Sequence, residues 1–164
     1  MHANAAREAW MDERTFKDAL GRWASGVAVV TCKTQSGQPV GLTVSSFSSL
    51  SLSPPLVLFC LGNRSSLLED FAQASHFAVN ILKSGQDALS NRFAFGDTPP
   101  FEGLAHSEGR GGAPLLPDAL ASLECRIEAR HPGGDHVIYV GEVEAASVAD
   151  GTPLVYSQGK YHHL

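Results

Sequence analysis

The sequence predicts a mainly β protein, in which antiparallel strands form a barrel and a few short helices lie at its periphery. About six or seven segments rich in β-branched and apolar residues are separated mostly by short turns, as in consecutive hairpins. Only three segments carry apolar residues at helical spacing, and each is short. Strands and helices do not alternate regularly, and neither a GxGxxG nor a Walker A sequence follows the first strand, which argues against a doubly wound nucleotide-binding sheet.

The length and charge of the chain narrow the classes of protein that it can belong to. The 164 residues suffice for one domain with a core, and we expect a flexible segment at 1–11 and a single domain at 12–164. The net charge is -5 without any basic cluster, so neither nucleic acid nor an anionic membrane is an expected partner. No apolar run reaches the ~18 residues of a spanning helix and the start lacks a signal-peptide core, which predicts a cytoplasmic protein.

Metal and disulfide chemistry have little support in the sequence. Cys32, Cys60 and Cys125 lie far apart, are odd in number and form no CxxC pair, which favours buried thiols in strands over a disulfide framework or a zinc site. No group of His, Asp and Glu residues has a convincing metal-ligand spacing. We therefore expect no metal site.

The first elements are a helix and a hairpin. Apolar residues recur at helical spacing over 12–24, where either Asp12 or Thr15 is available to cap the start. The β-branched segment 26–34, the turn residues 35–38 and the extended segment that starts at Pro39 then predict two antiparallel strands.

The stretch Gly41–Ser53, GLTVSSFSSLSLS, is the most unusual part of the sequence. It places six serines and a threonine between two strand-like segments. Serine hydroxyls, and backbone N–H groups where the ladder is interrupted, suit phosphate or the carbonyl oxygens of a heterocycle. The alternative is a β-edge whose hydroxyls are solvated. We expect Pro54-Pro55 to interrupt any ladder and to start a buried strand at Leu56–Leu61.

The segment Leu61–Leu67, LGNRSSL, combines a glycine turn with Arg64, Ser65 and Ser66 directly before a predicted helix, and one of these serines is expected to cap that helix. A positive charge, hydroxyls and helix N-terminal amides at one place make an anion site. The alternative is an ordinary N-cap beside a solvated arginine.

The second half of the chain repeats the same kinds of element. Residues 96–118 combine prolines and glycines without periodicity, as expected of a long excursion that is either a lid or simply loose. The other segments are predicted as follows: a strand at 76–82, a helix at 86–95, a long hairpin of 120–130 and 136–148 around a Pro-Gly-Gly-Asp turn, and two short extended segments at 153–156 and 159–161.

His136 is the histidine placed best for chemistry. It follows the turn Gly133-Gly134-Asp135 and opens a strand, so its imidazole can meet a ligand at a barrel rim, with Asp135 fixing its orientation. The alternative is a solvated turn histidine. The many serines do not indicate a hydrolase, because the sequence has no G-x-S-x-G elbow.

Taken together, these segments resemble the flavin reductase-like family, which has an FMN-binding split barrel and includes the small reductase components of two-component flavin monooxygenases. The resemblance runs in order from Phe16 to Tyr161. The residues that carry it are Ser25-Gly26-Val27, Val29-Val30-Thr31, Gly41-Leu-Thr-Val-Ser-Ser-Phe47, Ser51-Leu-Ser-Pro-Pro55, Phe77-Ala-Val-Asn80, Phe93-Ala94, Gly134-Asp-His136 and Pro153-Leu-Val-Tyr156.

The resemblance implies a split-barrel homodimer with flavin near the subunit interface. It implies that the segment Thr43–Ser49 surrounds the isoalloxazine and ribityl groups mainly through its main chain, and that Phe93 lines the flavin pocket. The flavin contacts expected in that segment come from Thr43, Val44, Ser45, Ser46 and Ser49. The resemblance also implies that Arg64, Ser65 and Ser66 lie toward the phosphate, and that His136 and Tyr161 help to place the nicotinamide.

One position departs from the family pattern. Many relatives have Thr-Ala-Asn-Ser-Phe where this chain has Thr43-Val-Ser-Ser-Phe47, so Ser45 lacks the amide that donates to the flavin, while main-chain contacts stay possible. The sequence ties no residue to an adenosine group, which leaves both FMN and FAD open.

The resemblance implies an NAD(P)H-dependent flavin reductase, which transfers hydride from NADH or NADPH to flavin and supplies reduced flavin to an oxygenase. In such an enzyme the cofactors carry the chemistry and the protein orients them, with His136 as a positioning group. The alternative is a split-barrel protein that binds flavin or haem without turnover, and a third interpretation is a structural or partner-binding barrel.

Overall fold

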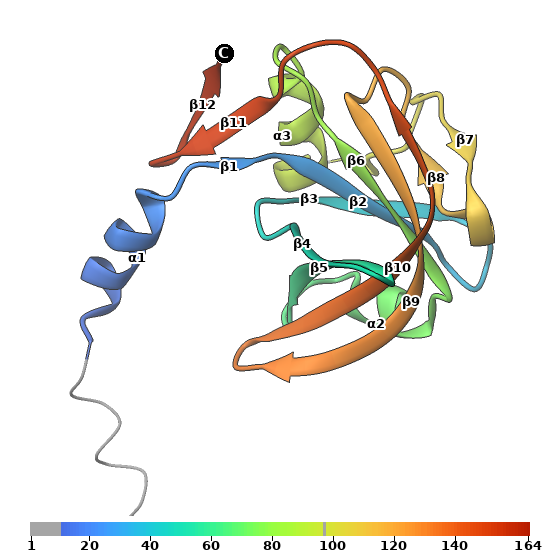
Figure 1. Ribbon diagram of the computed structural model, residues 1–164, viewed down its shortest axis with the longest axis horizontal. Coiled ribbons are helices and arrows are strands. Elements are labelled where there is room, and N and C mark those ends of the chain that lie inside the picture. The colour runs from blue at the N-terminus through green and yellow to red at the C-terminus, as the bar shows by residue number, and fades with distance from the viewer. Residues whose placement is uncertain (1–10, 97) are drawn as a thin grey trace, which may run out of the picture.

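Seven antiparallel strands form a curled sheet in the computed structural model, which describes residues 11–96 and 98–164 (Figure 1). The strand order is β3-β2-β6-β9-β10-β5-β4. These strands are β2 (Ala28–Lys33), β3 (Pro39–Val44), β4 (Ser48–Leu52), β5 (Pro55–Gly62), β6 (His76–Ile81), β9 (Ala121–Gly133) and β10 (His136–Val148). Although β3 and β4 follow each other in the chain, they lie at opposite edges of the sheet, so the barrel has an open seam. The predicted antiparallel split barrel is confirmed.

A second, three-stranded sheet lies beside the barrel and next to the N-terminal helix (Figure 1). It consists of β1 (Ser25–Gly26), β11 (Leu154–Ser157) and β12 (Lys160–His163) in the order β1-β11-β12. The helix α1 spans Glu13–Gly21, and its last residue accepts a hydrogen bond from the Gln158 amide in the β11–β12 turn (2.8 Å). The second sheet therefore joins the two ends of the described chain.

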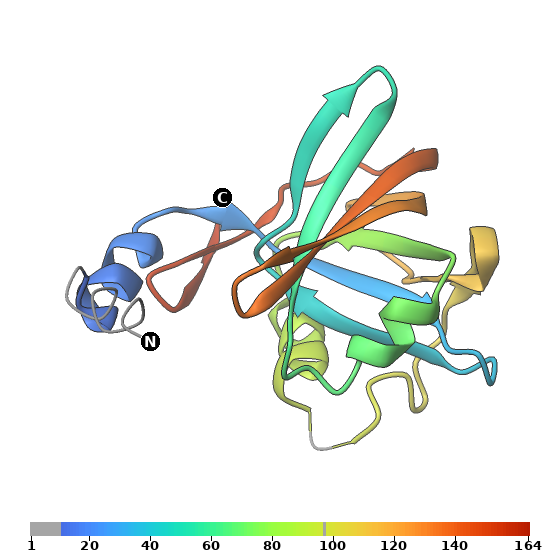
Figure 2. The same ribbon diagram turned by 90° about the horizontal axis from the view of Figure 1, so that it is seen from below.

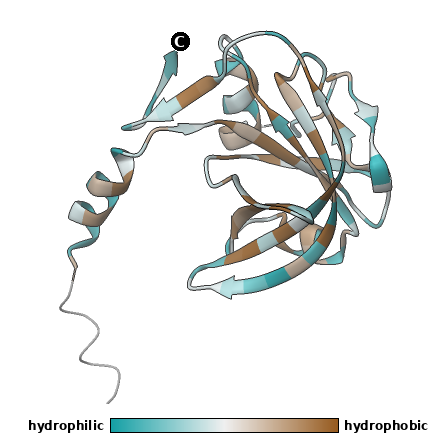
Figure 3. Ribbon diagram, viewed as in Figure 1, coloured by the Kyte–Doolittle hydropathy of each residue, from teal (hydrophilic) through white to brown (hydrophobic). Residues whose placement is uncertain are grey.

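The helix α1 forms where the sequence predicts it, and Asp12 is its N-cap, accepting from the Thr15 amide at 2.9 Å. Its apolar side chains are nevertheless uncovered, with Trp23, just beyond the helix, 80% exposed. Figure 3 shows apolar residues on α1 as well as along the barrel strands. None of the described residues buries this helix face.

Two other helices pack against the barrel, α2 (Leu68–Gln73) and α3 (Asp87–Phe95). The prediction of a serine cap on the first of them is wrong. Ser65 accepts from the Leu67 amide (3.2 Å) in the preceding turn, whereas the N-cap position of α2 is Leu67, which has no capping side chain. The serine stabilises the turn because a hydroxyl two residues upstream reaches the amide before the helix begins.

The expectation that Pro54-Pro55 interrupts the ladder is also wrong. Leu52 pairs with Pro55, so the two residues between them form the turn of a β4–β5 hairpin that extends beyond the other strands (Figure 2). Proline is compatible with this arrangement because it is tolerated in a turn and at the first residue of a strand. Part of the serine-rich stretch is therefore a strand.

The excursion at 96–118 is not loose in its second half. It contains β7 (Ser107–Glu108), a 3₁₀ turn at Arg110–Gly112 and β8 (Pro114–Leu115), while Ala113 and Leu116 are buried. The excursion has no sequence periodicity because its anchors are hydrogen bonds to the barrel rather than a regular apolar face.

Asn80 provides two of these anchors from inside the barrel. Its side chain, which is fully buried, donates to the carbonyls of Val29 (3.2 Å) and Pro114 (3.4 Å) and accepts from the Leu116 amide (2.9 Å). A buried amide that satisfies both its donor and acceptor groups fixes the two segments relative to each other. Asn80 thus ties residues 114–116 to β2 and β6.

The core consists of two clusters of apolar side chains. Inside the barrel, Phe59 packs against Phe71, Phe77 and Tyr139 with ring centroids 5.0–5.5 Å apart. The second cluster lies between the sheet and α3; its buried members are Val27, Val29, Leu82, Phe93, Leu116 and Leu154. The second cluster holds α3 against the barrel next to the open seam.

The three cysteines lie in strands, as the sequence predicts, and all are free. Cys32 and Cys125 are fully buried, and burial raises the pKa of each thiol to about 12. These two thiols therefore stay protonated and unreactive at neutral pH.

Two negative findings hold for the described ranges. No helix there is both long and apolar enough to cross a membrane. No three His, Cys, Asp or Glu side chains of residues 11–96 and 98–164 are grouped so that they could hold a metal ion.

The predicted flexible segment 1–11 lies, apart from Met11, outside the described residues.

We expect Asn80→Ala to lower the free energy of unfolding by about 1–3 kcal/mol, because it leaves buried backbone groups without partners. Urea denaturation measures the change. Ser147→Ala, at an exposed position near the end of β10, is the control and should change stability by less than about 0.5 kcal/mol. Equal stabilities of the two variants would contradict the anchoring role.

Candidate functional site

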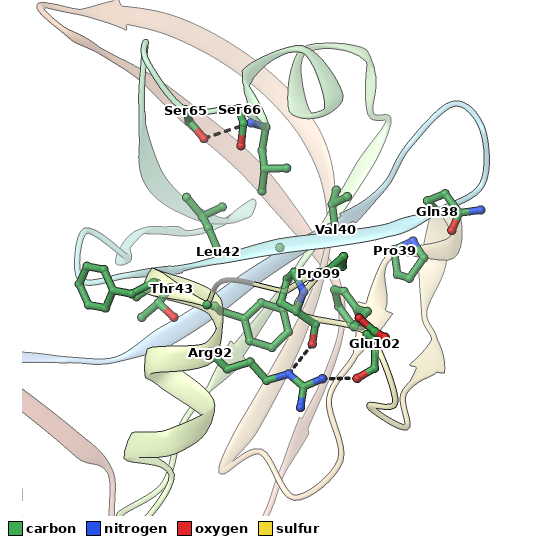
Figure 4. A pocket seen from close by; sticks show the side chains of 18 residues that line it. Gln38, Pro39, Val40, Leu42, Thr43, Ser65, Ser66, Arg92, Pro99 and Glu102 are labelled. Carbon is green, nitrogen blue, oxygen red and sulfur yellow. Dashed lines mark hydrogen bonds between the residues drawn. The ribbon is translucent and has the colours of Figure 1, made fainter.

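A cavity of about 990 Å³ runs along β3 at the open seam of the barrel (Figure 4). Three other segments complete its walls: the turn before α2, the C-terminal half of α3 and residues 99–102. The lining residues are Gln38, Pro39, Val40, Gly41, Leu42, Thr43, Ser65, Ser66, Leu67, Arg92, Phe93, Ala94, Phe95, Gly96, Pro99, Pro100, Phe101 and Glu102.

The position of β3 gives this cavity its chemistry. Within the described residues β3 pairs only with β2, so its other edge presents backbone N–H and C=O groups without a strand partner. Val40 and Leu42, which pack against the barrel core, lie on this strand (Figure 4). A planar heterocycle with one polar edge therefore finds both apolar walls and main-chain partners here.

Gly41 allows an aromatic side chain to approach the strand closely. A Cβ atom at this position would lie 2.9 Å from Thr31 Cγ2 and 3.3 Å from Phe93 Cε1, which is too close for an ordinary contact. The absence of a side chain lets Phe93 of α3 pack directly on β3. Phe93, which is 5% exposed, is thus a fixed wall of the cavity.

A second cavity, of about 230 Å³, shares Thr43, Ala94 and Phe95 with the first. Its other lining residues are Val27, Val44, Ser45, Ser90, Tyr156 and Tyr161. The end of β3 therefore lines two adjoining cavities, one on the side of residues 99–102 and one on the side of the second sheet.

A short hydrogen-bond network joins the walls of the second cavity. The Tyr161 hydroxyl donates to Asn91 Oδ1 (2.9 Å), so its oxygen accepts from the Ser90 hydroxyl (2.7 Å). Thr43 Oγ1 donates to the Ser90 carbonyl (2.6 Å). Tyr161 and Thr43 are therefore both fixed relative to α3 through Ser90, which is fully buried.

The predicted site residues fall into three groups. Thr43, Ser65, Ser66 and Phe93 line the larger cavity, whereas Val44, Ser45 and Tyr161 line the smaller one together with Thr43. Ser46, Ser49, Arg64 and His136 line neither cavity.

Ser46 has a structural role at the seam. Its hydroxyl accepts from the Cys60 amide (3.0 Å) and donates to the Cys60 carbonyl (3.3 Å), in the manner of a paired strand residue. Ser49 is an exposed residue of β4 that pairs with Val57. A flavin contact of either side chain stays a prediction.

His136 lies at the tip of the β9–β10 hairpin, where it pairs with Gly62 at the end of β5, and Arg64 lies in the turn that follows β5. The imidazole Nδ1 lies 2.7 Å from Asp135 Oδ1, and the Asn63 amide donates to the Asp135 carbonyl (2.9 Å). The hydrogen bond with His136 lowers the pKa of Asp135, with a smaller contribution from the charge of Arg64. Asp135 thus orients the imidazole as the sequence predicts.

Sequence reasoning missed Ser90, Asn91 and Arg92, which contribute to the cavities from α3. Their partners are a hydroxyl and backbone carbonyls from distant segments, and no local spacing signals such contacts. The described residues that line the two cavities include no histidine, cysteine or methionine, so Tyr156 and Tyr161 of the smaller cavity are the side chains there that could ligate haem iron.

Comparison with known proteins identifies the family of this chain. Residues 20–164 match the model of the flavin reductase like domain. The chain belongs to the flavin reductase-like family. This match covers nearly all of the barrel and the second sheet, so the family resemblance seen in the sequence is confirmed.

Family members that are named for an activity are similar to this chain over most of their length. The chain is 45% identical to the FMN reductase (NADH) SmoA of Agrobacterium fabrum, over 92% of this chain and 85% of that protein. It is 44% identical to the reductase component of 4-hydroxyphenylacetate 3-monooxygenase of Thermus thermophilus, over 93% and 97%. The chain is also similar to a solved structure, that of the NADH:FAD oxidoreductase SgcE6 of Streptomyces globisporus C-1027 in complex with NAD and FAD fragments. The two structures superpose with a TM-score of 0.87, and the sequences are 35% identical over 93% of each chain.

We expect Arg64→Ala to reduce the free energy of FMN binding by about 1.5–3 kcal/mol, which is a loss of affinity of at least about 10-fold. A hydrogen bond to a charged group contributes about this much free energy. Riboflavin, which lacks the phosphate, should bind almost as well as before. Titration of flavin fluorescence measures both affinities. Equal losses for FMN and riboflavin would show that Arg64 does not contact phosphate.

Proposed function

We propose that this protein is an NADH-dependent flavin reductase, which transfers hydride from NADH to FMN and also accepts FAD. In this proposal the reduced flavin passes to a partner monooxygenase. The relatives support the reaction by their names, since one is an NADH-dependent FMN reductase and another is the reductase component of a monooxygenase.

The observation that carries the proposal is the cavity along the unpaired edge of β3. An isoalloxazine ring is planar and largely apolar, with polar atoms at one edge, and the cavity combines apolar walls with free main-chain groups. The donor set therefore fits a flavin. When bound, the flavin supplies the ring that accepts hydride.

We assign the flavin contacts as follows. The main chain at Thr43–Ser46 and the Phe93 ring hold the isoalloxazine, while Ser65, Ser66 and Arg64 hold the phosphate. The two serines line the same cavity as Phe93, and Arg64 precedes them in the turn after β5. His136 and Tyr161 place the nicotinamide.

We further propose that the protein is a cytoplasmic homodimer. Phe16, Leu20 and Trp23 in and beside α1 are 51%, 58% and 80% exposed, and Leu52 at the tip of the β4–β5 hairpin is 95% exposed. Large apolar side chains of this kind are typical of a covered interface. A cytoplasmic location would give access to the NADH pool.

Steady-state oxidation of NADH and NADPH with FMN, FAD and riboflavin in turn tests the proposal. We expect NADH with FMN to give the highest kcat/KM and NADPH to be a poor substrate. Protein that binds flavin but oxidises neither nucleotide would instead be a non-catalytic flavin-binding member of the family.

We expect His136→Ala to raise the KM for NADH by about 5- to 10-fold, because this factor corresponds to the free energy of one lost hydrogen bond. The Kd for FMN should stay unchanged. His131→Ala, at an exposed position on the same hairpin, is the matched control. An unchanged KM together with weaker FMN binding would reverse the assignment and place His136 on the flavin.

A further inference from the structure

We infer that Arg92 is a positioning residue, which fixes residues 99–102 as a wall of the larger cavity and thereby determines how tightly the cavity holds the flavin ring. The inference rests on the proposed function because it assigns the flavin to this cavity. Neither the sequence patterns nor the family resemblance pointed to Arg92.

The first observation is the pair of hydrogen bonds made by the guanidinium. Arg92 Nε donates to the Pro100 carbonyl (2.7 Å), and Nη2 donates to the Glu102 carbonyl. Figure 4 shows the arginine reaching from α3 to these two carbonyls. A planar guanidinium can donate to two carbonyls at once, whereas a lysine ammonium lacks this fork geometry.

The second observation is the aromatic contact between the two carbonyls. Phe101 packs edge-on against Phe93 with ring centroids 5.1 Å apart, and against His106 at 4.9 Å. Phe93 in turn packs on β3 at Gly41. Arg92 therefore holds the backbone on both sides of the residue that supports the Phe93 wall.

Residues 99–104 also carry their own turn hydrogen bonds. The Glu102 amide donates to the Pro99 carbonyl (3.0 Å), and the Leu104 amide donates to the Phe101 carbonyl (3.1 Å). Pro99 and Pro100 have no N–H groups and so cannot donate a hydrogen bond to a neighbouring strand. The segment is thus held to α3 by Arg92 and Phe101 rather than by a ladder.

A direct contact with the flavin phosphate is the competing role for this side chain. Among the described residues that line the larger cavity, Arg92 is the one lysine or arginine. Two of its donors, however, already point at carbonyls, and Figure 4 shows it away from Ser65 and Ser66, on the other side of β3. A positioning role depends on the fork geometry, whereas a phosphate contact depends mainly on the charge.

The variants Arg92→Lys and Arg92→Ala separate the two roles. We expect both to weaken the binding of FMN and of riboflavin by similar factors of about 10-fold, since the wall loses two hydrogen bonds to a charged group. Fluorescence titration gives the Kd values. Arg126→Ala, on the outer surface at β9, is the control and should bind both flavins like the unchanged protein.

Amide hydrogen exchange of the flavin-free variants gives a readout that does not depend on activity. We expect faster exchange at the Glu102 and Leu104 amides, with unchanged protection at Val79 in β6 as the check that the barrel is folded. Arg92→Lys provides the comparison if the alanine variant does not fold. Because these measurements need no turnover, they stand even if the protein fails to oxidise NADH.

The positioning role is overturned by either of two results. In one, Arg92→Lys binds FMN normally while Arg92→Ala loses affinity for FMN but not for riboflavin, which would make the side chain a phosphate ligand. In the other, both variants retain normal flavin affinity and normal exchange at Glu102 and Leu104.

Discussion

The unpaired edge of β3 is the constraint on which the site depends. Strands β3 and β4 are the two edges of the main sheet, and no ladder joins them among the described residues. Next to the gap, the Ser46 hydroxyl bonds to both backbone groups of Cys60 and so continues the pairing of β4 with β5 beyond Ser48 and Leu58. Farther along, β3 faces the larger cavity, where its backbone groups are accessible to water or to a ligand.

The helix α3 converts this open edge into a shaped site. Four consecutive residues of the helix contact three different parts of the protein, namely β3, β12 and residues 99–102, because successive side chains on a helix point about 100° apart. Ser90 bonds to Thr43 and to the Tyr161 hydroxyl, and Asn91 also bonds to that hydroxyl. Arg92 and Phe93 hold the segment at 99–102. A shift of this one helix would therefore change both cavities together.

The sequence predicts the architecture better than it predicts the contacts. The hairpins, the three helices and the antiparallel barrel follow from periodicity and turn residues, and the family follows from the ordered set of motifs. The prediction for Pro54-Pro55 is wrong because prolines are excluded from central strands but not from the hairpin turn at Ser53-Pro54 or from the first residue of β5. Arg92 could not be recognised because its partners are backbone carbonyls, which every residue carries.

The two residues assigned to the nicotinamide are fixed to different parts of the site. Strand pairing holds His136 opposite Gly62, and the hydrogen bond from the Asn63 amide to the Asp135 carbonyl holds the same turn. Arg64 follows Gly62 by two residues. Tyr161 is instead held to Thr43 through Ser90. The tip of the β9–β10 hairpin is therefore fixed to the turn that is proposed to hold the flavin phosphate. The strand β12 is fixed to β3, which is proposed to hold the isoalloxazine ring. Within one chain these residues share no described cavity, so a nicotinamide that contacts both must extend between the two ends or lie where a second subunit brings them together.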